Sequence, residues 1–388
     1  MRPARMPSAA CSALVCALAC AGVVAPDPAT LPRASDAPGF AQALTVRPFV
    51  FPQDHGPHPE FRQEWWYLTG NLDAANGERF GFELTFFRFA LAPTAAAPAA
   101  APPVAPSAWR AREIYMAHFA ITDVARRHFR FAQKLSRGAL GLAGAEAAPL
   151  KVWIDDWSLA EAAAAPGEPA DAPHAWRVHA AEPGYELELV LSPQQAPVAN
   201  GDAGLSRKSD QLADASYYYS IPHLTAHGRL IRDGQPLALA GLAWLDREWG
   251  SGGLAPQQAG WDWFALQLSD GSSLMFYALR GRDGRPDAHS AGTWVSGAGE
   301  AQALRSTDVA ITVTGEWRNA AGVRYPSGWR VRVGPQALEL SIRPVLANQE
   351  LNTTPPYWEG AVDVSGARAG HSLTGRGYVE LTGYHTER

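Results

Sequence analysis

Residues 216–268 read SYYYSIPHLTAHGRLIRDGQPLALAGLAWLDREWGSGGLAPQQAGWDWFALQL, and the folding pattern of the chain is clearest in this stretch. Apolar and aromatic residues alternate with polar ones in short runs, and Gly and Pro mark the turns between them, which is typical of antiparallel β-strands. Two runs carry an acid among tryptophans, at Asp246 and at Asp262. Because a buried carboxylate is costly to ionise, Asp246 is either paired with a cation or held partly protonated for chemistry.

A second clear strand pattern is a predicted hairpin nearer the N-terminus. Residues 64–72 (EWWYLTGNL) and 80–88 (FGFELTFFR) flank an Asn-Gly turn. Further strands are expected at 114–123, 129–134, 153–159, 175–180, 185–191, 237–245, 260–268, 273–280, 292–296, 309–318, 328–333, 338–343, 357–364 and 375–382. The pattern therefore predicts an all-β fold built as a duplicated barrel.

The turn of the first hairpin suggests how its two strands pair. It places Tyr67 opposite Glu83 and Trp65 opposite Thr85 on one face, with Trp66 on the other face. A slip of one residue would exchange the two faces.

Length and charge limit the protein classes that fit this sequence. A chain of 388 residues is longer than one core usually allows, so we expect two domains, at 45–224 and 225–388, with the boundary near Pro222. The net charge is −5 and Lys and Arg form no basic stripe, which argues against a nucleic-acid surface.

The N-terminus has the features of an export signal. Arg2 and Arg5 precede an apolar run too short to span a bilayer, so we predict a signal peptide at 1–25, followed by a Pro- and Ala-rich tether at 26–44. All three cysteines lie in the signal peptide. The run ending at Cys20 resembles a lipobox, so lipidation there and ordinary cleavage near residue 25 both stay open. Either outcome predicts a secreted or periplasmic protein.

Four segments of the chain resemble a known family. They are EWWYLTG (64–70), SYYYS (216–220), AWLDREW (243–249) and GWDWFALQL (260–268). From about Val46 onward the chain is similar to the secreted AttH-type proteins, which are related to the carotenoid 1,2-hydratases. The resemblance implies two lipocalin-like (calycin-type) antiparallel β-barrels or half-barrels. It also implies a hydrophobic small-molecule ligand and a link to an ABC transporter system.

The hydratase branch of this family suggests a role for Asp246. There the matching aspartate protonates an alkene, supported by a His-x-Trp pair in the preceding strand and a Tyr two residues before the acid. In this sequence Trp244 stands at the Tyr position, and Tyr217 and Tyr219 stand at the His-x-Trp positions. We expect Asp246 to lie in an aromatic pocket, but the specific carotenoid reaction does not follow from these residues.

Other candidate residues have two readings each. Glu64 and Glu83 form an acidic pair in the first barrel, or one of them binds an arginine and closes the barrel end as in lipocalins. Asp262 lies between Trp261 and Trp263 and points into a cavity or pairs with an arginine. The substrate-binding candidates are therefore Glu64, Trp65, Tyr67, Glu83, Tyr217, Tyr219, Trp244, Trp261, Asp262 and Trp263.

Two functions fit these expectations. The first is an exported enzyme in which Asp246 protonates an isoprenoid- or polyketide-like substrate for hydration, isomerisation or cyclisation. The second is a non-catalytic carrier that hands a lipid to or from an ABC export system. Neither hypothesis involves a cofactor or a metal, and no serine nucleophile motif is present in the sequence.

Overall fold

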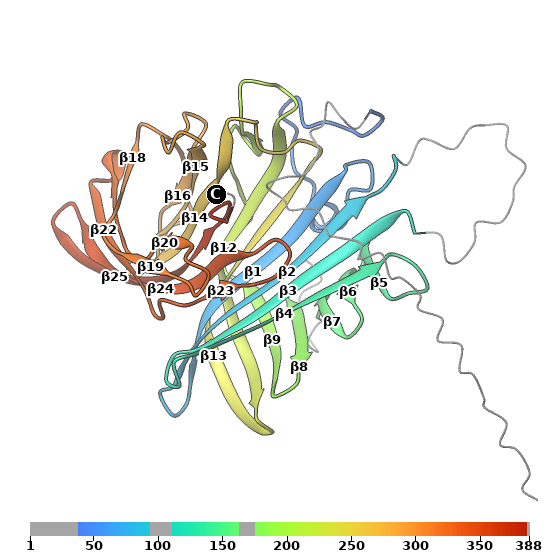
Figure 1. Cartoon of the computed structure of the whole chain (residues 1–388), viewed down its shortest axis with the longest axis horizontal. Helices are drawn as coiled ribbons and strands as arrows, with labels where there is room; N and C mark the ends of the chain where they lie inside the picture. The colour runs from blue at the N-terminus through green and yellow to red at the C-terminus, as the bar shows by residue number, and fades with distance from the viewer. Residues whose placement is uncertain (1–37, 94–110, 163–174, 386–388) are drawn as a thin grey trace, which may run out of the picture.

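The computed structural model describes residues 38–93, 111–162 and 175–385. The all-β prediction is confirmed: two antiparallel sheets each curl into a nearly closed barrel (Figure 1). In the described residues the helical segments are the 3-10 turns η2 (Gln53–His55) and η3 (Gly334–Gln336). None of these helical segments is long and apolar enough to cross a membrane. The predicted signal peptide and Cys20 lie outside the described residues.

The first barrel is a sheet of thirteen strands within the described part of the chain. Its hydrogen-bonded order is β4-β3-β2-β1-β13-β12-β9-β8-β7-β6-β5, and β10 and β11 both pair with β12. The bounds are β1 (Gln63–Ala74), β2 (Arg79–Ala90), β3 (Glu113–Asp123), β4 (His128–Arg137), β5 (Ala143–Ala147), β6 (Leu150–Ile154), β7 (Trp157–Glu161), β8 (Trp176–Glu182), β9 (Tyr185–Pro193), β10 (Val198–Ala199), β11 (Leu205–Arg207), β12 (Ala215–Arg232) and β13 (Gln235–Gly250).

The second barrel is a sheet of ten strands in the order β17-β16-β15-β14-β25-β24-β22-β21-β18, with β23 pairing β24, again within the described residues. A separate two-stranded sheet joins β19 and β20. The bounds are β14 (Gln258–Leu268), β15 (Ser273–Gly281), β16 (Ala291–Val295), β17 (Ala301–Arg305), β18 (Val309–Val313), β19 (Glu316–Arg318), β20 (Arg324–Pro326), β21 (Trp329–Val333), β22 (Leu338–Pro344), β23 (Glu350–Leu351), β24 (Tyr357–Arg368) and β25 (His371–Leu381).

The chain passes from the first barrel to the second at a later position than the predicted domain boundary. The division expected between residues 224 and 225 falls inside β12, because Pro222 lies in a β-bulge between Ile221 and Leu224 and not in a linker. The chain leaves the first sheet only after Gly250 and enters the second at Gln258. The strands β12 and β13 therefore belong to the first barrel over their whole length.

The packed chain also begins earlier than the predicted tether allowed. Ala41 donates its backbone N–H to the Glu60 carbonyl over 2.9 Å, and Ala43 is fully buried against the first barrel. The expected tether therefore packs against the barrel in its last residues, and its earlier part lies outside the described chain.

The first hairpin keeps the predicted faces but not the predicted pairing. Tyr67 lies opposite Thr85, and Thr69 opposite Glu83, so the ladder is shifted by two residues from the expected one. A shift of two leaves every side chain on its face, because side chains alternate with a period of two. Trp65 and Tyr67 thus still share a face with Glu83.

One predicted strand is a hairpin in the structure. Residues 153–159 turn at Asp155, whose φ of 53° is in the left-handed region, and the chain runs back as β7. The two aspartates at 155–156 form the short turn, for which Asp and Asn are well suited.

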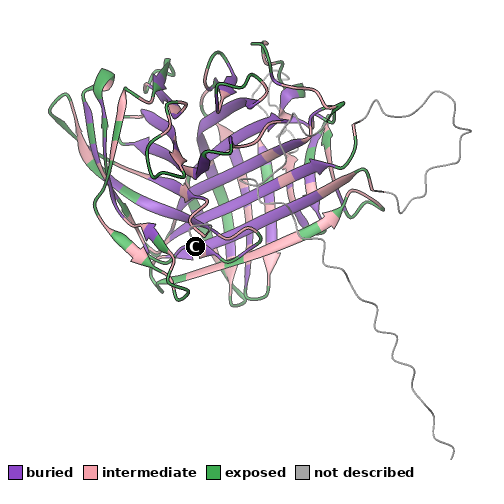
Figure 2. Cartoon of the chain, turned by 45° about the horizontal axis from the view of Figure 1, so that its top comes forward, coloured by how far each residue is buried: buried purple, intermediate pink, exposed green. Residues whose placement is uncertain are grey.

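The three largest apolar clusters of the described residues follow from this arrangement. Each barrel has its own apolar interior, and a third cluster joins the outer faces of the two sheets. Figure 2 shows that buried residues run along the strands of both sheets. The third cluster contains Tyr67, Tyr218 and Trp244 from the first sheet and Trp263 and Tyr277 from the second. The strands that carry the tryptophan-rich sequence segments therefore meet between the barrels.

Candidate functional site

A cavity of about 130 Å³ lies at this contact between the two sheets. Residues of both sheets line it. From the first sheet come Trp65, Tyr67, Phe87, Tyr218, Asp246 and Glu248, and from the second come Trp261, Trp263, Tyr277, Leu279, Tyr357 and Glu380. Its wall is thus mainly aromatic, with a few carboxyl groups among the rings.

Asp246 is the buried acid of the cavity wall on β13. Its side chain is 3% exposed and accepts three hydrogen bonds. Ser220 Oγ donates to Oδ1 over 2.5 Å, Trp244 Nε1 donates to Oδ1 over 2.6 Å, and the Tyr218 hydroxyl donates to Oδ2. No lysine, arginine or histidine of the described chain forms an ion pair with this carboxyl.

Two further donors, Trp263 and Asn200, support the direction of the hydrogen bonds from Tyr218 and Ser220. Trp263 Nε1 is 3.1 Å from the Tyr218 hydroxyl, and an indole N–H can only donate. Asn200 Nδ2 is in turn 2.8 Å from Ser220 Oγ and also donates. Each hydroxyl therefore already accepts one hydrogen bond, and its own proton is directed at Asp246.

These surroundings act on the acidity of Asp246 in opposite directions. Burial raises its pKa, the hydrogen bonds from Ser220, Tyr218 and Trp244 lower it, and nearby Glu248 raises it again. The net result is a pKa of about 7. Such a carboxyl exchanges its proton near neutral pH, which is what a general acid or base requires.

Of the tyrosines in β12, the one that reaches the cavity is not among those expected. Tyr217 and Tyr219 point into the first barrel, where the Tyr217 hydroxyl donates to the Thr45 carbonyl and the Tyr219 hydroxyl contacts His55 Nδ1 over 2.6 Å. Tyr218 takes the expected place, because the bulge at Pro222 puts Ser220 directly opposite Asp246. The residues that support Asp246 are therefore Tyr218, Ser220 and Trp244.

Several other candidates do meet at the cavity. Trp65, Tyr67, Trp261 and Trp263 line it, and Trp244 lies behind Asp246 in the same cluster. The five residues come from β1, β13 and β14, which are far apart in sequence. The structure brings them together around one acid.

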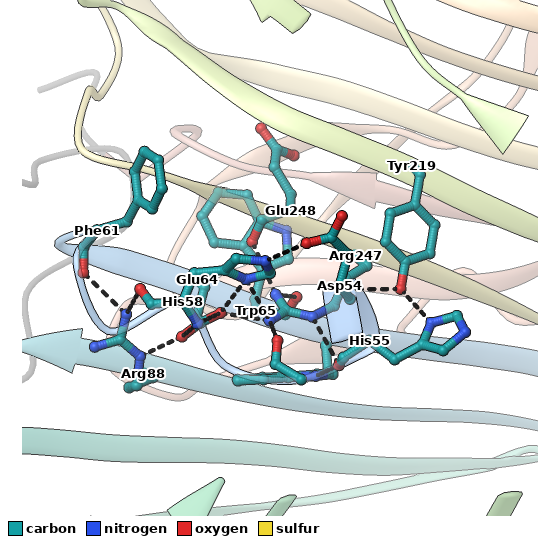
Figure 3. A network of polar contacts seen from close by, with 12 residues as sticks. Asp54, His55, His58, Phe61, Glu64, Trp65, Arg88, Tyr219, Arg247 and Glu248 are labelled. Carbon is teal, nitrogen blue, oxygen red and sulfur yellow. Dashed lines mark hydrogen bonds and ion pairs between the residues drawn. The ribbon is translucent and has the colours of Figure 1, made fainter. Parts of the chain in front are cut away.

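Glu64 lies in the first barrel, away from this group. It forms ion pairs with Arg88 and Arg247, and His58 donates its backbone N–H to Oε1 over 3.0 Å (Figure 3). The Arg247 guanidinium lies 3.8 Å from the centre of the Trp66 ring. This is the arginine-bound arrangement at a barrel end that the sequence left open for Glu64. The two arginines hold the pKa of Glu64 well below its usual range, although burial opposes this.

Glu248 follows Arg247 on β13 but belongs to the cavity side. In Figure 3 its carboxyl points away from the Glu64 network. It accepts from Ser216 Oγ over 2.5 Å and lies 3.4 Å from Lys208 Nζ, which also lines the cavity. The Lys208 ammonium is 3.9 Å from the Tyr277 ring centre. Burial lowers the pKa of Lys208, and Glu248 more than offsets this, so the pKa is raised.

Asp262 and Glu83 occupy different surroundings. Asp262 points away from the cavity and pairs with Arg280 over 2.9 Å, with a further hydrogen bond from the Tyr384 hydroxyl. Glu83 is fully buried at the contact between the sheets, where Thr85 Oγ1 donates to Oε1 over 2.5 Å. Burial raises the pKa of Glu83 to about 8.

Sequence reasoning missed several polar residues of this region. They are Tyr218, Ser220, Lys208, His118, Glu359 and Glu380. Tyr218 and Ser220 stood in the quoted SYYYS segment, and only the strand pairing shows that they face Asp246. Glu380 lies inside the strand predicted at 375–382, and no local signal marks it as part of a site. In the described parts of the chain no group of three or more His, Cys, Asp or Glu is arranged to hold a metal ion.

The two barrels and the acid-bearing aromatic cavity between them define a lipocalin-like protein of two β-barrels. The chain belongs to the AttH-like family, whose model matches residues 42–384. A solved structure of AttH from Nitrosomonas europaea is 35% identical, covers 89% of this chain and 99% of its own, and superposes with a TM-score of 0.76.

Two similar proteins have names that describe a reaction. Dehydratase asqC of Emericella nidulans is 23% identical over 236 residues, which is 53% of this chain and 60% of that protein. The match thus spans less than two thirds of the dehydratase. Kievitone hydratase of Nectria haematococca shares the fold with a TM-score of 0.64 at 14% identity, over 89% of this chain and 97% of its own.

Proposed function

We propose that this protein adds water to, or removes water from, a hydrophobic unsaturated substrate, with Asp246 as the acid. The observation that carries the proposal is a buried carboxyl that has no cationic partner in the described chain and lines an aromatic cavity. The names of the dehydratase and the hydratase among the similar proteins support the same kind of reaction.

Tyr218 supports this chemistry in both protonation states of Asp246. When the carboxyl is ionised, the tyrosine hydroxyl donates to it. When Asp246 gains a proton on Oδ2, the hydroxyl can accept that proton's hydrogen bond and turn its own proton away from Asp246. Both residues line the cavity, so either one is placed to deliver a proton to a bound alkene. The surrounding aromatic rings favour a developing positive charge on the substrate.

The cavity size supports a ligand class. A cavity of about 150 Å³ in another protein holds benzene, and the present one measures about 130 Å³. A ring or a short branched alkene thus fits at Asp246, with the rest of an isoprenoid- or polyketide-like molecule extending beyond it. We also propose that the protein is exported, with or without a lipid at Cys20, and works beside an ABC transporter system. The features of the N-terminal sequence and the family resemblance support these two points.

The test is turnover of two probes in isotope-labelled water. A prenylated phenol and an aryl β-hydroxyketone represent the two ligand classes, and heavy oxygen entering the alcohol is read by mass spectrometry. Replacing Asp246 by Asn should lower the rate by about 10² to 10⁴-fold, the usual contribution of general acid catalysis. The melting temperature and probe affinity should stay close to those of the parent.

Two outcomes would contradict the proposal. If D246N exchanges oxygen as fast as the parent, Asp246 is not the acid. If the parent binds a probe stoichiometrically and never converts either one, the carrier function is favoured in its place.

A further inference from the structure

Three glutamates from three strands meet where the two sheets touch. Glu83 comes from β2, Glu359 from β24 and Glu380 from β25. Glu359 and Glu380 are direct partners across the β24–β25 ladder. Like charges directly opposite each other destabilise a sheet, so both carboxyls are not ionised together without cost.

Each of these glutamates has a single hydrogen-bond donor in the described chain. Thr85 donates to Glu83, the Tyr67 hydroxyl donates to Glu359 over 2.6 Å, and Trp261 Nε1 donates to Glu380 over 2.8 Å. No Lys, Arg or His in the described residues forms an ion pair with any of them. Oε2 of Glu83 and Oε2 of Glu359 are fully buried and have no hydrogen-bond partner. Without a cation to stabilise their ionised forms, these three carboxyl groups keep their protons to a higher pH than ion-paired glutamates do.

Glu380 differs from the other two in its access to the cavity. Glu83 and Glu359 are fully buried, whereas Glu380 is half-buried and lines the cavity. Its Oε1 has no hydrogen bond to any described residue. Asp246 lines the same cavity from the other sheet. Two carboxyl groups, one from each barrel, thus border one space.

We propose that Glu380 is a second catalytic residue, which takes the proton of the attacking water while Asp246 serves the substrate carbon. This inference rests on the proposed hydration and assigns its second proton transfer. Two positioned carboxyls that divide acid and base roles are a general solution to such chemistry.

The step balances as follows. Protonated Asp246 gives its proton to one alkene carbon, the π electrons form the new C–H bond, and the other carbon becomes positive. Water attacks that carbon and forms the C–O bond, and ionised Glu380 takes the water's spare proton. Asp246 ends ionised and Glu380 protonated, and the proton returns through water in the cavity. Dehydration is the same sequence reversed.

The groups around Glu380 are consistent with this division. Burial raises its pKa to about 7, the hydrogen bond from Trp261 opposes this, and the charges of Asp246 and Glu248 raise it further. The other titratable groups that face it are Glu359 on the neighbouring strand, Tyr67 on β1, Glu83 on β2 and Tyr357 on β24. Since Asp246 and Glu380 have similar pKa values and repel each other's charge, the form with one proton between them is favoured near neutral pH.

The test separates the two proton transfers with the prenylated phenol. Deuterium from heavy water enters the alkene when Asp246 protonates it, and heavy oxygen enters the product only when water adds. Glu380→Gln should lose oxygen incorporation by about 10²-fold or more and keep deuterium incorporation. Asp246→Asn should lose both. Asp262→Asn is the matched control, because this buried acid on β14 points away from the cavity, and both rates per folded molecule should persist.

Each failure has its own signature. If E380Q incorporates oxygen at the parent rate, the role of Glu380 is overturned while that of Asp246 stands. If D246N keeps deuterium incorporation, the proposed function fails instead. A measurement without substrate completes the test: carboxyl carbon NMR of glutamate-labelled protein, with Glu380 assigned by its loss in E380Q. A midpoint near neutral pH that falls in D246N is expected, and a midpoint at the ordinary value near 4.5 overturns the proposal.

Discussion

Tyr218 donates its hydroxyl proton to Asp246, and Trp263 Nε1 occupies the acceptor side of that hydroxyl over 3.1 Å. Trp263 belongs to the second barrel, whereas Tyr218 and Asp246 belong to the first. The protonation of Asp246 is therefore sensitive to how the two barrels sit against each other. A break at this contact would free the Tyr218 hydroxyl to turn away from the carboxyl.

Replacing Tyr218 by Phe should raise the pKa of Asp246. In the parent, the Tyr218 hydrogen bond stabilises the ionised carboxyl, so its removal favours the protonated form. A hydrogen bond contributes about 0.5–1.5 kcal/mol net, which corresponds to a rise in the pKa of up to about one unit. The pH midpoint for deuterium incorporation into the prenylated phenol should move upward by that amount. Tyr217→Phe is the control, because its hydroxyl bonds to Thr45 on the other face. A midpoint that falls or stays in Y218F would contradict the hydrogen-bond direction derived above.

Replacing Glu64 by Gln should destabilise the fold strongly. The change leaves Arg247 buried without its carboxylate partner and leaves Arg88 paired with Glu113 alone, and breaking such a network typically costs about 3–5 kcal/mol. Urea unfolding measures this. Glu339→Gln, in an exposed pair with Arg332, should change the free energy of unfolding by less than about 0.5 kcal/mol. If E64Q unfolds like the parent and loses probe binding, Glu64 acts at the ligand and not at the barrel end.

The sequence predicted the strands well because alternation is a local signal. The face shared by Trp65, Tyr67 and Glu83 was found even though the hairpin register was two residues off, since an even shift keeps the faces. The barrel contact itself is not local. The packing of one sheet on the other depends on the topology of the whole chain. Only this packing places Glu380 at the cavity.

The family resemblance led us to expect Tyr217 and Tyr219 beside Asp246, and an uninterrupted strand count would have agreed with it. Counted back from the Asp233-Gly234 turn without interruption, Asp246 lies opposite Ile221 and shares a face with Tyr219 and Tyr217. The bulge at Pro222 removes one residue from that count, and Ser220 becomes the partner of Asp246. A bulge of one residue exchanges the faces of everything beyond it. A proline in a strand indicates that a bulge is favourable there, but it does not predict how the two strands pair beyond the bulge.

Replacing Glu83 by Gln should flatten the dependence of stability on pH. The pKa of Glu83 is raised from 4.5 to about 8 by burial, so its protonation favours the folded state. This contribution is fully present below pH 4.5 and is lost as pH rises through 8, because the folded protein keeps a proton that the unfolded chain has released. Between pH 5 and 8 the parent's free energy of unfolding should fall more steeply than that of E83Q.

Chemical denaturation at several pH values checks this prediction. Asp363→Asn is the matched control, because its carboxylate is exposed and paired with Arg79. Its slope should match the parent's. An E83Q slope as steep as the parent's would mean that Glu83 is ionised in the folded protein at neutral pH.

Replacing Trp261 by Phe should raise the pKa of Glu380 and move the optimum for water addition to higher pH. The indole N–H stabilises the ionised carboxyl over 2.8 Å, and its loss leaves burial and the nearby acids unopposed. Ionised Glu380 is the form that accepts the water's proton, so the heavy-oxygen rate should fall most at low pH and recover as pH rises. The expected shift is up to about one unit. Trp153→Phe is the control, because its indole bonds to the Gly141 carbonyl in the first barrel. An unchanged midpoint in W261F, with a uniform loss of rate, would mean that Trp261 only shapes the cavity and that Glu380 does not titrate during water addition.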